Sequence, residues 1–155
     1  MNTDSKFRKA ERIVSQKTID DLFSGTGSQS LVAFPIRAVY KTYLSPIPEH
    51  GSPARPFRTL SPERTRSLST LHLPPSTILI SVPKRRFKHA VDRNRVKRQL
   101  RESYRHHKTL LTDRIPLGQT VSIAFIWLSD DHFPSAVIDK RVESLLKRIA
   151  DRLSC

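Results

Sequence analysis

The sequence predicts a small single-domain protein of the α+β class, in which a mixed sheet packs against helices. Its 155 residues suit one domain. Two short apolar segments, 77–82 and 121–128, have the length and composition of buried strands. Between them, residues 92–111 carry apolar side chains at helical spacing. A parallel strand–helix–strand unit is therefore expected in this half of the chain.

The N-terminal part of the chain predicts a short helix followed by strand structure. Residues 1–12 are polar and basic, and we expect them to be mobile. Ser15 can cap a helix that runs to about Ser24. Residues 31–44 alternate between apolar and polar, as strands do, and Pro35 favours a sheet edge or a break into two strands. The side chains expected to face one way are Val32, Phe34, Ile36, Ala38 and Tyr40.

Residues 45–76 form a proline-rich segment between these strands and the parallel unit. They hold seven of the eleven prolines and show no helical or strand periodicity. We expect a disordered or loosely packed insertion, because such a sequence has little apolar surface to bury. After the strand at 121–128, Pro134 and Ser135 begin a last amphipathic helix. Its apolar face comprises Ile138, Val142, Leu145, Leu146, Ile149 and Leu153.

Composition and hydropathy argue against several classes of protein. Cys155 is the only cysteine, so neither a disulfide framework nor a cysteine-based metal site is expected. The sequence contains no run of 18 apolar residues, and its N-terminus lacks the apolar stretch of a signal peptide. We therefore expect a cytoplasmic protein with no membrane partner.

The strongest functional signal is the basic segment 84–108. It holds eleven Lys or Arg against two carboxylates, a net charge of +9 out of +14 for the whole chain. Charge this concentrated repels itself unless a polyanion neutralises it, which favours a nucleic-acid partner. The alternative is a solvated helix face or a disordered basic tail.

The helical pattern inside this segment argues against a disordered tail. Val96, Leu100 and Tyr104 fall on one stripe of the helical wheel, about 80° wide. Asp92 can cap the start of the helix. One face of the helix therefore suits a protein core and the other suits phosphates. The polar residues on the second face are Asn94, Lys97, Arg98, Arg101, Arg105 and Lys108.

Residues 92–101, Asp-Arg-Asn-Arg-Val-Lys-Arg-Gln-Leu-Arg, follow Ser-Val-Pro-Lys-Arg at 81–85. Together they closely resemble the signature of the bacterial ribonuclease P protein family. Its hallmark is an Arg-Asn-Arg box followed by Lys-Arg and a further Arg, and this chain fills every position. The order of the expected elements extends the resemblance over most of the chain. The residues of the box are Arg93, Asn94, Arg95, Lys97, Arg98 and Arg101.

The resemblance implies a ribosomal protein S5 domain 2-like fold with the element order α-β-β-β-α-β-α. It also implies a left-handed crossover, whereas general statistics favour a right-handed one. The implied function is that of the protein subunit of ribonuclease P, whose RNA subunit holds the catalytic Mg²⁺ and removes the 5′ leader from precursor tRNA. The protein would bind the RNA subunit through the six box residues. It would bind the leader of precursor tRNA through Phe23, Lys84, Arg85, Arg86 and Tyr40.

Aromatic residues on the first helix of the family meet the leader, and stacking is a sequence-tolerant way to bind single strands. Phe23 matches one such position, whereas Ile19 replaces the other aromatic. Core packing is the alternative for Phe23. For Tyr40 the core is the stronger expectation.

The chemistry expected of a protein nuclease is weak in this sequence. Clustered carboxylates for metal ions, or a histidine pair for acid–base catalysis, would be needed. Asp130, Asp131 and His132 follow a strand and precede a helix, so a turn is the simpler interpretation. His106 and His107 diverge by about 100° on a helix, so we expect them at the surface or among phosphates. We therefore expect no protein catalytic residue and no protein metal ligand.

Three other functions stay open at this point. The first is a ribosomal or general RNA-binding protein of similar fold, which would share the basic helix but need not carry the unbroken box. The second is a DNA-binding regulator that uses 92–108 as a recognition helix, although such proteins usually have a partner helix just upstream. The third is a free-standing nuclease that uses Asp130 and Asp131. Processing of precursor tRNA, general RNA affinity and activity without added RNA distinguish these possibilities.

Overall fold

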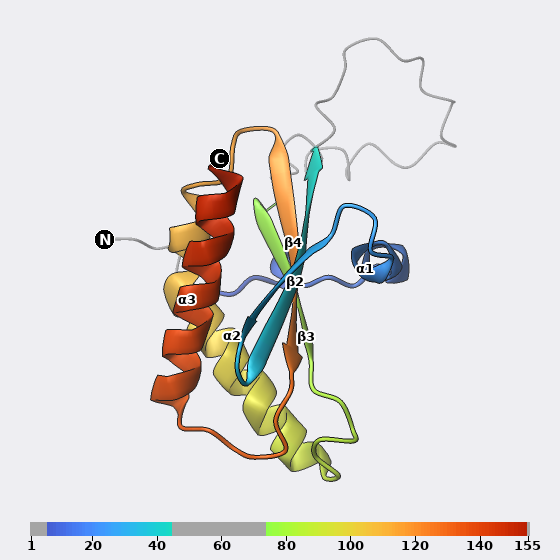
Figure 1. The fold of residues 1–155 in the computed structure, drawn as a ribbon, viewed down its shortest axis with the longest axis vertical. Helices are drawn as coiled ribbons and strands as arrows, with labels where there is room; N and C mark the ends of the chain where they lie inside the picture. The colour runs from blue at the N-terminus through green and yellow to red at the C-terminus, as the bar shows by residue number, and fades with distance from the viewer. Residues whose placement is uncertain (1–5, 45–73, 155) are drawn as a thin grey trace, which may run out of the picture.

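The computed structural model describes residues 6–44 and 74–154, and the fold is given for these residues (Figure 1). The elements follow one another in the predicted order, with a short 3-10 helix added at the beginning. They are η1 (Lys9–Glu11), α1 (Gln16–Phe23), β1 (Gln29–Ala33), β2 (Ile36–Leu44), β3 (Ser76–Ser81), α2 (Ala90–Thr112), β4 (Gln119–Trp127) and α3 (Ser135–Leu153).

The strands form one mixed sheet in the order β1-β2-β4-β3. β2 pairs antiparallel with both β1 and β4, while β3 pairs parallel with β4. Because α2 connects β3 to β4, the parallel pairing confirms the predicted strand–helix–strand unit. The predicted break at Pro35 is also confirmed, since residues 34–35 form the turn between β1 and β2.

That turn corrects the predicted alternation. Ile36, Ala38 and Tyr40 are buried on one face as expected, but Val32 and Phe34 are 51% and 56% exposed. The reversal of the chain at Pro35 changes which residues of β1 share the face of β2. Leu31 lies opposite Ala38 in the antiparallel register and is therefore buried, so Leu31 rather than Val32 belongs to the core.

Helices cover the two faces of the sheet unequally. Figure 1 shows α2 and α3 together on one face and α1 on the other. The larger core lies under α2 and α3, where Trp127, Phe125 and Tyr104 are fully buried. The Tyr104 hydroxyl lies 2.5 Å from Ser76 Oγ, and burial raises the pKa of this tyrosine. The predicted apolar face of the last helix is confirmed for Ile138, Val142, Leu145, Leu146 and Ile149, which are all fully buried.

Residues 6–12, part of the segment that was expected to be mobile, contact the rest of the fold; residues 1–5 lie outside the described part. The Phe7 ring packs edge-on against Tyr104 at 6.0 Å between ring centroids. Arg12 forms a parallel bridge with Ile78 on the outer edge of β3. Glu11 is buried, and its carboxylate accepts a hydrogen bond of 2.9 Å from Lys108 Nζ. The N-terminal segment is therefore fixed to both β3 and α2.

Lys108 is thus a second correction, because the helical wheel placed it with the phosphate-facing residues. It lies at one edge of that face, where the N-terminal segment covers α2. Its ammonium group also donates to the backbone oxygen of Lys6 at 2.8 Å. A buried lysine needs such partners, because an unpaired buried charge is strongly unfavourable. Lys108 therefore stabilises the fold and does not contribute to the exposed basic face.

The start of α2 also differs from the prediction. His89, not Asp92, occupies the N-cap position, and Asp92 lies in the first turn. There its carboxylate lies 3.1 Å from His132 Nε2.

Of the predicted insertion 45–76, residues 45–73 lie outside the described part of the chain. Ser76 already belongs to β3 and is buried.

Replacing Lys108 with Met should destabilise the protein markedly, because the Glu11 carboxylate would stay buried without an opposite charge, bonded only to the backbone N–H of Arg8. We expect a loss of about 3–5 kcal/mol in the free energy of unfolding, measured by urea denaturation. The matched control is Lys147→Met, which removes a pair with Glu143 on the surface of α3. The control should cost about 1 kcal/mol or less. Equal effects of the two variants would contradict a structural role for Lys108.

Candidate nucleic-acid interface

The two faces of α2 separate a protein core from a row of cations. Val96, Leu100 and Tyr104 have no exposed surface, which confirms the predicted apolar stripe. Arg95 and Arg98 lie on the remaining surface of the helix and are exposed. At 3.6 residues per turn, burial of the stripe determines which side chains point outward.

Four basic residues of the box, Arg95, Lys97, Arg98 and Arg101, form what we call the open cations. Within the part of the chain that the structure describes, none of the four has a side-chain hydrogen bond, ion pair or ring contact. Arg95 and Arg98 are exposed, while Lys97 and Arg101 are half-buried. Asn94, the uncharged member of the box, is also exposed. Their charges are therefore available to an external anion.

Several cations outside this group are paired with carboxylates of the protein. Arg105 pairs with Glu102 on the same helix, and Arg114 lies 3.1 Å from Asp151 on α3. Lys147 pairs with Glu143 at 2.6 Å. The described acidic groups thus neutralise basic residues away from the box and leave the open cations to an external partner.

Arg93 belongs to the box but holds the local fold. Its Nη1 donates to the backbone oxygens of Phe87 and Lys88, both at 2.8 Å. These two bonds fasten the loop before α2 onto the first turn of the helix. Arg93 is half-buried, so it positions its neighbours in addition to any contact it makes with RNA.

The predicted leader residues of the loop between β3 and α2 differ in their surroundings. Lys84 and Arg85 are exposed. Arg86 is half-buried and its Nη1 lies 3.2 Å from an oxygen of Asp130. Arg86 therefore connects this loop to the end of β4, whereas Lys84 and Arg85 are available to a ligand.

The α1 helix directs Phe23 outward by burying its neighbour. Leu22 has no exposed surface and packs with Val39 and Ala124 on this face of the sheet. Phe23 is 47% exposed. Core packing, the alternative considered for this ring, is thus the role of Leu22.

Asp21 fixes α1 to the sheet, a role that sequence analysis missed. Its carboxylate accepts hydrogen bonds from Lys41 Nζ at 2.9 Å and from the Tyr43 hydroxyl at 2.8 Å. The bond from Lys41, followed by that from Tyr43, lowers the pKa of Asp21. Burial, together with the hydrogen bond to Asp21, raises the pKa of Tyr43 to about 12. No local pattern links these residues, which only the packing of α1 on β2 brings together.

Tyr40 does not join the other predicted leader residues. It is 2% exposed and belongs to the core under α2 and α3, on the opposite face of the sheet from α1. Its hydroxyl donates to Gln29 Oε1 at 2.6 Å. The ring of Tyr40 is therefore enclosed by protein. Of the two roles considered for Tyr40, leader binding and core packing, the structure agrees with core packing, which was the stronger expectation.

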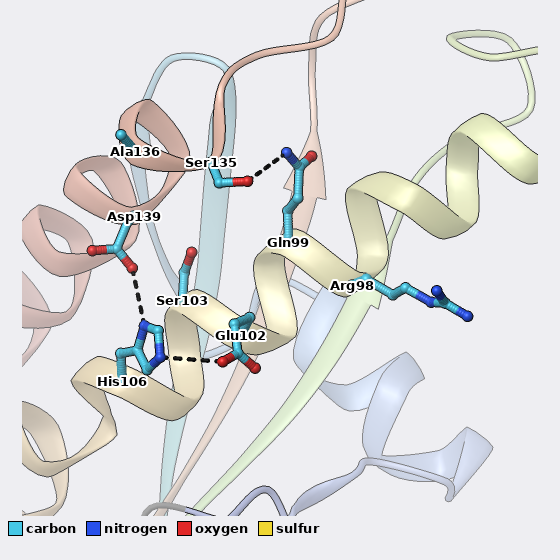
Figure 2. Close-up of a pocket in the computed structure, with 8 residues that line it drawn as sticks. All are labelled: Arg98, Gln99, Glu102, Ser103, His106, Ser135, Ala136 and Asp139. Carbon is cyan, nitrogen blue, oxygen red and sulfur yellow. Dashed lines mark hydrogen bonds and ion pairs between the residues drawn. The ribbon is translucent and has the colours of Figure 1, made fainter.

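The two histidines of α2 connect this helix to α3. Figure 2 shows the groove between the helices, with His106 between Glu102 and Asp139 and with Arg98 extending away from it. His107 Nε2 lies 2.8 Å from the Asp139 carboxylate. Burial raises the pKa of Asp139, but the hydrogen bond with His107 outweighs this effect, so the pKa is lowered. The histidines therefore hold two helices together and are not placed among the open cations.

Of the two acidic residues considered for a nuclease, Asp130 has its carboxylate engaged elsewhere. Asp130 pairs with Arg86, and the Asp131 N–H donates to Ser129 Oγ at 3.0 Å, so the predicted turn is confirmed. His132 stacks on Phe87 with 4.6 Å between ring centroids. Over residues 6–44 and 74–154, no group of three or more His, Cys, Asp or Glu residues could hold a metal ion. In the same residues, no helix has the length and apolar character needed to cross a membrane.

The fold and this surface define an α+β protein that offers one face of a helix to a polyanion. A family model described as Ribonuclease P matches residues 7–150. The proteins named ribonuclease P protein component from two strains of Porphyromonas gingivalis are 33% and 34% identical over 143 residues. Each match covers 92% of this chain and 85% of the relative. The chain therefore belongs to the ribonuclease P protein family and is a protein subunit of ribonuclease P, a tRNA-processing ribonuclease.

Solved structures agree on the fold. The RNase P protein from Thermotoga maritima superposes with a TM-score of 0.58 at 17% identity, covering 89% of this chain and 96% of that one. The same protein in complex with 1-(4-fluorophenyl)-2-thiourea gives a TM-score of 0.55 at 18% identity, covering 87% and 98%. The alternative of a ribosomal or general RNA-binding protein is not favoured by these comparisons.

Replacing Asp21 with Asn should loosen α1 at neutral pH but not in acid. The folded-state pKa of Asp21 is lowered, so its stabilising effect is present above the ordinary pKa of 3.8 and is lost as the pH falls through the lowered value. Thermal unfolding should therefore give a lower Tm for Asp21→Asn than for the wild type at about pH 7, with the difference closing as the pH falls below 3.8 and through the lowered pKa. A difference that stays constant across this range would exclude the ionised carboxylate as the cause.

Proposed function

We propose that this chain binds the RNA subunit of ribonuclease P through the open cations and Asn94 of α2, and that Arg93 holds this surface in place. The observation that carries the proposal is that these four charges have no partner within the described protein. Like charges gathered on one helix face repel one another, and phosphates relieve that repulsion. Binding to phosphates positions the protein on RNA without requiring a particular sequence.

We further propose that the 5′ leader of precursor tRNA runs past the exposed end of α1 and the loop before α2. Phe23 offers a half-exposed ring for stacking, and Lys84 and Arg85 offer charges to the backbone. This combination of one aromatic face and nearby cations binds single strands with little sequence preference. Arg86 contributes to the shape of the loop through Asp130, and Tyr40 is not part of this surface.

In this proposal the RNA subunit carries out the cleavage. Mg²⁺ would stabilise charge on the reacting phosphate, as metal ions do in phosphoryl transfer. The described residues offer no cluster of ligands for such an ion, and several of their carboxylates, such as Asp130 and Asp151, are engaged with basic side chains. The part of this chain is to bind and orient the two RNAs. Reconstitution of the protein with the RNA subunit and precursor tRNA tests this function directly.

Binding to the RNA subunit should depend strongly on salt. If each of the four open cations contacts a phosphate, log K should fall against log salt with a slope of about −3 to −3.5, at roughly 0.7–0.9 per contact. Arg98→Ala should reduce the slope by about one unit. Arg141→Ala is the control, because Arg141 is an exposed arginine on α3 with no partner in the described residues. A wild-type slope near −1 would mean that the basic face is mostly solvated.

The two proposed surfaces should separate in reconstituted enzyme. Replacing Arg95 and Arg98 with Ala should weaken assembly whatever the substrate, because their partner is the RNA subunit. Replacing Phe23 with Leu and Arg85 with Ala should leave assembly nearly intact but reduce the preference for precursor over mature tRNA by about tenfold, the size of one lost stacking contact. Binding titrations with both tRNAs measure this preference.

Phe23→Leu alone separates stacking from packing. Leucine keeps apolar bulk but cannot stack on a base, so a normal thermal melt together with reduced discrimination supports the leader surface. If this variant folds normally and still discriminates precursor from mature tRNA as the wild type does, Phe23 does not contact the leader.

A further inference from the structure

A small cavity opens where the N-terminal segment, the outer edge of β3 and α2 meet. Its volume is about 140 Å³. The side chains around it are of two kinds, basic and apolar or aromatic, and its lining contains no carboxylate. The basic ones are Arg12, Lys97 and Arg101, and the others include Phe7, Ile13 and Ile80.

Contacts between distant parts of the sequence build this cavity. The backbone N–H of Ile13 donates to Ile78 O at 3.0 Å, which places the N-terminal segment along the edge of β3. The buried pair of Glu11 with Lys108 holds the same segment against α2. The position of Arg12 relative to Lys97 and Arg101 is therefore set by the fold.

Arg12 is oriented for stacking. Its guanidinium lies over the ring of Phe7, 5.5 Å from the ring centroid, and in the described residues it makes no side-chain hydrogen bond or ion pair. Arg12 is exposed, so the side of the guanidinium away from Phe7 is open to a ligand. Guanidinium planes stack on RNA bases as aromatic rings do.

The size of the cavity is compatible with a single ring system. An apolar cavity of about 150 Å³ in a protein core accepts one benzene molecule, so an open cavity of about 140 Å³ has room for the ring of one base. Apolar walls suit the base, and the adjoining open cations suit its phosphate.

We propose that this cavity binds one unpaired nucleotide of the RNA subunit, with the base between Arg12 and the apolar walls and the phosphate at Lys97 and Arg101. This inference rests on the proposed function, because Lys97 and Arg101 belong to the surface assigned to the RNA subunit. The larger groove between α2 and α3 is less suited to a nucleotide, since Glu102 and Asp139 line it and repel phosphate.

Free nucleotides test the pocket without the RNA subunit. AMP and ribose 5-phosphate carry the same phosphate, but only AMP carries a base. In NMR titrations of the full chain, AMP should shift the amide resonances of Ile78–Ile80 and saturate at least fivefold earlier than ribose 5-phosphate. The substitution Arg12→Lys, which keeps the charge but removes the planar group, should abolish this difference. Equal titrations by the two compounds, or AMP shifts only elsewhere, would overturn the proposal.

The RNA subunit then identifies the source of the nucleotide. Arg12→Lys should weaken its binding about tenfold, whereas the matched control Arg141→Lys should change binding less than twofold. Unchanged binding of Arg12→Lys, where Arg98→Ala weakens binding, would overturn the pocket but not the proposed function. If Arg12→Lys reduces only the preference for precursor over mature tRNA, the bound base belongs to the leader, and the proposal that it comes from the RNA subunit is overturned. If Arg98→Ala has no effect, the proposed function fails and the AMP titration alone decides on the pocket.

Discussion

The burial of one stripe of α2 is the constraint on which the rest of the structure depends. Val96, Leu100 and Tyr104 fix the rotation of the helix about its axis, so the direction of every other side chain on it follows. A helix this basic is unfavourable alone, because its charges repel one another. Burial of the stripe under the sheet offsets this repulsion. The same packing that stabilises the helix therefore presents the open cations to solvent.

The distribution of carboxylates strengthens this separation. Glu102 pairs with Arg105 beyond the box, Asp139 with His107, and Asp151 with Arg114 after the end of α2, while Glu11 is buried with Lys108. Exposed pairs of this kind contribute little stability. Their larger effect is electrostatic, because they neutralise cations away from the box and leave the positive potential concentrated on one face. A polyanion approaching the protein is thereby steered to that face.

Local sequence patterns predicted the helices and strands of this fold. The features that they did not predict depend on contacts between residues that are distant in the sequence. The spacing of apolar residues and the composition of the strands were enough to predict the stripe of α2, the parallel unit and the last helix. Lys108 lies on the basic side of the helical wheel, and only the return of the N-terminal segment onto α2 buries it. Val32 was assigned to the wrong face because alternation does not continue through the turn at Pro35. In the candidate site, the box was visible in sequence, whereas Asp21 and Arg12 acquire their roles from packing.

The edge of β3 joins the surfaces that the two RNAs are proposed to use. Lys97 and Arg101 reach this edge from α2, and Arg12 reaches it from the segment that leads directly into α1. Asp21 then fixes α1 on β2, so Phe23 cannot move far without breaking bonds to Lys41 and Tyr43. Every element between the open cations and Phe23 is thus held by a buried contact or a hydrogen bond. If the two RNAs bind as proposed, a protein built in this way would hold them in a fixed relation and would need no catalytic group to influence where the leader lies.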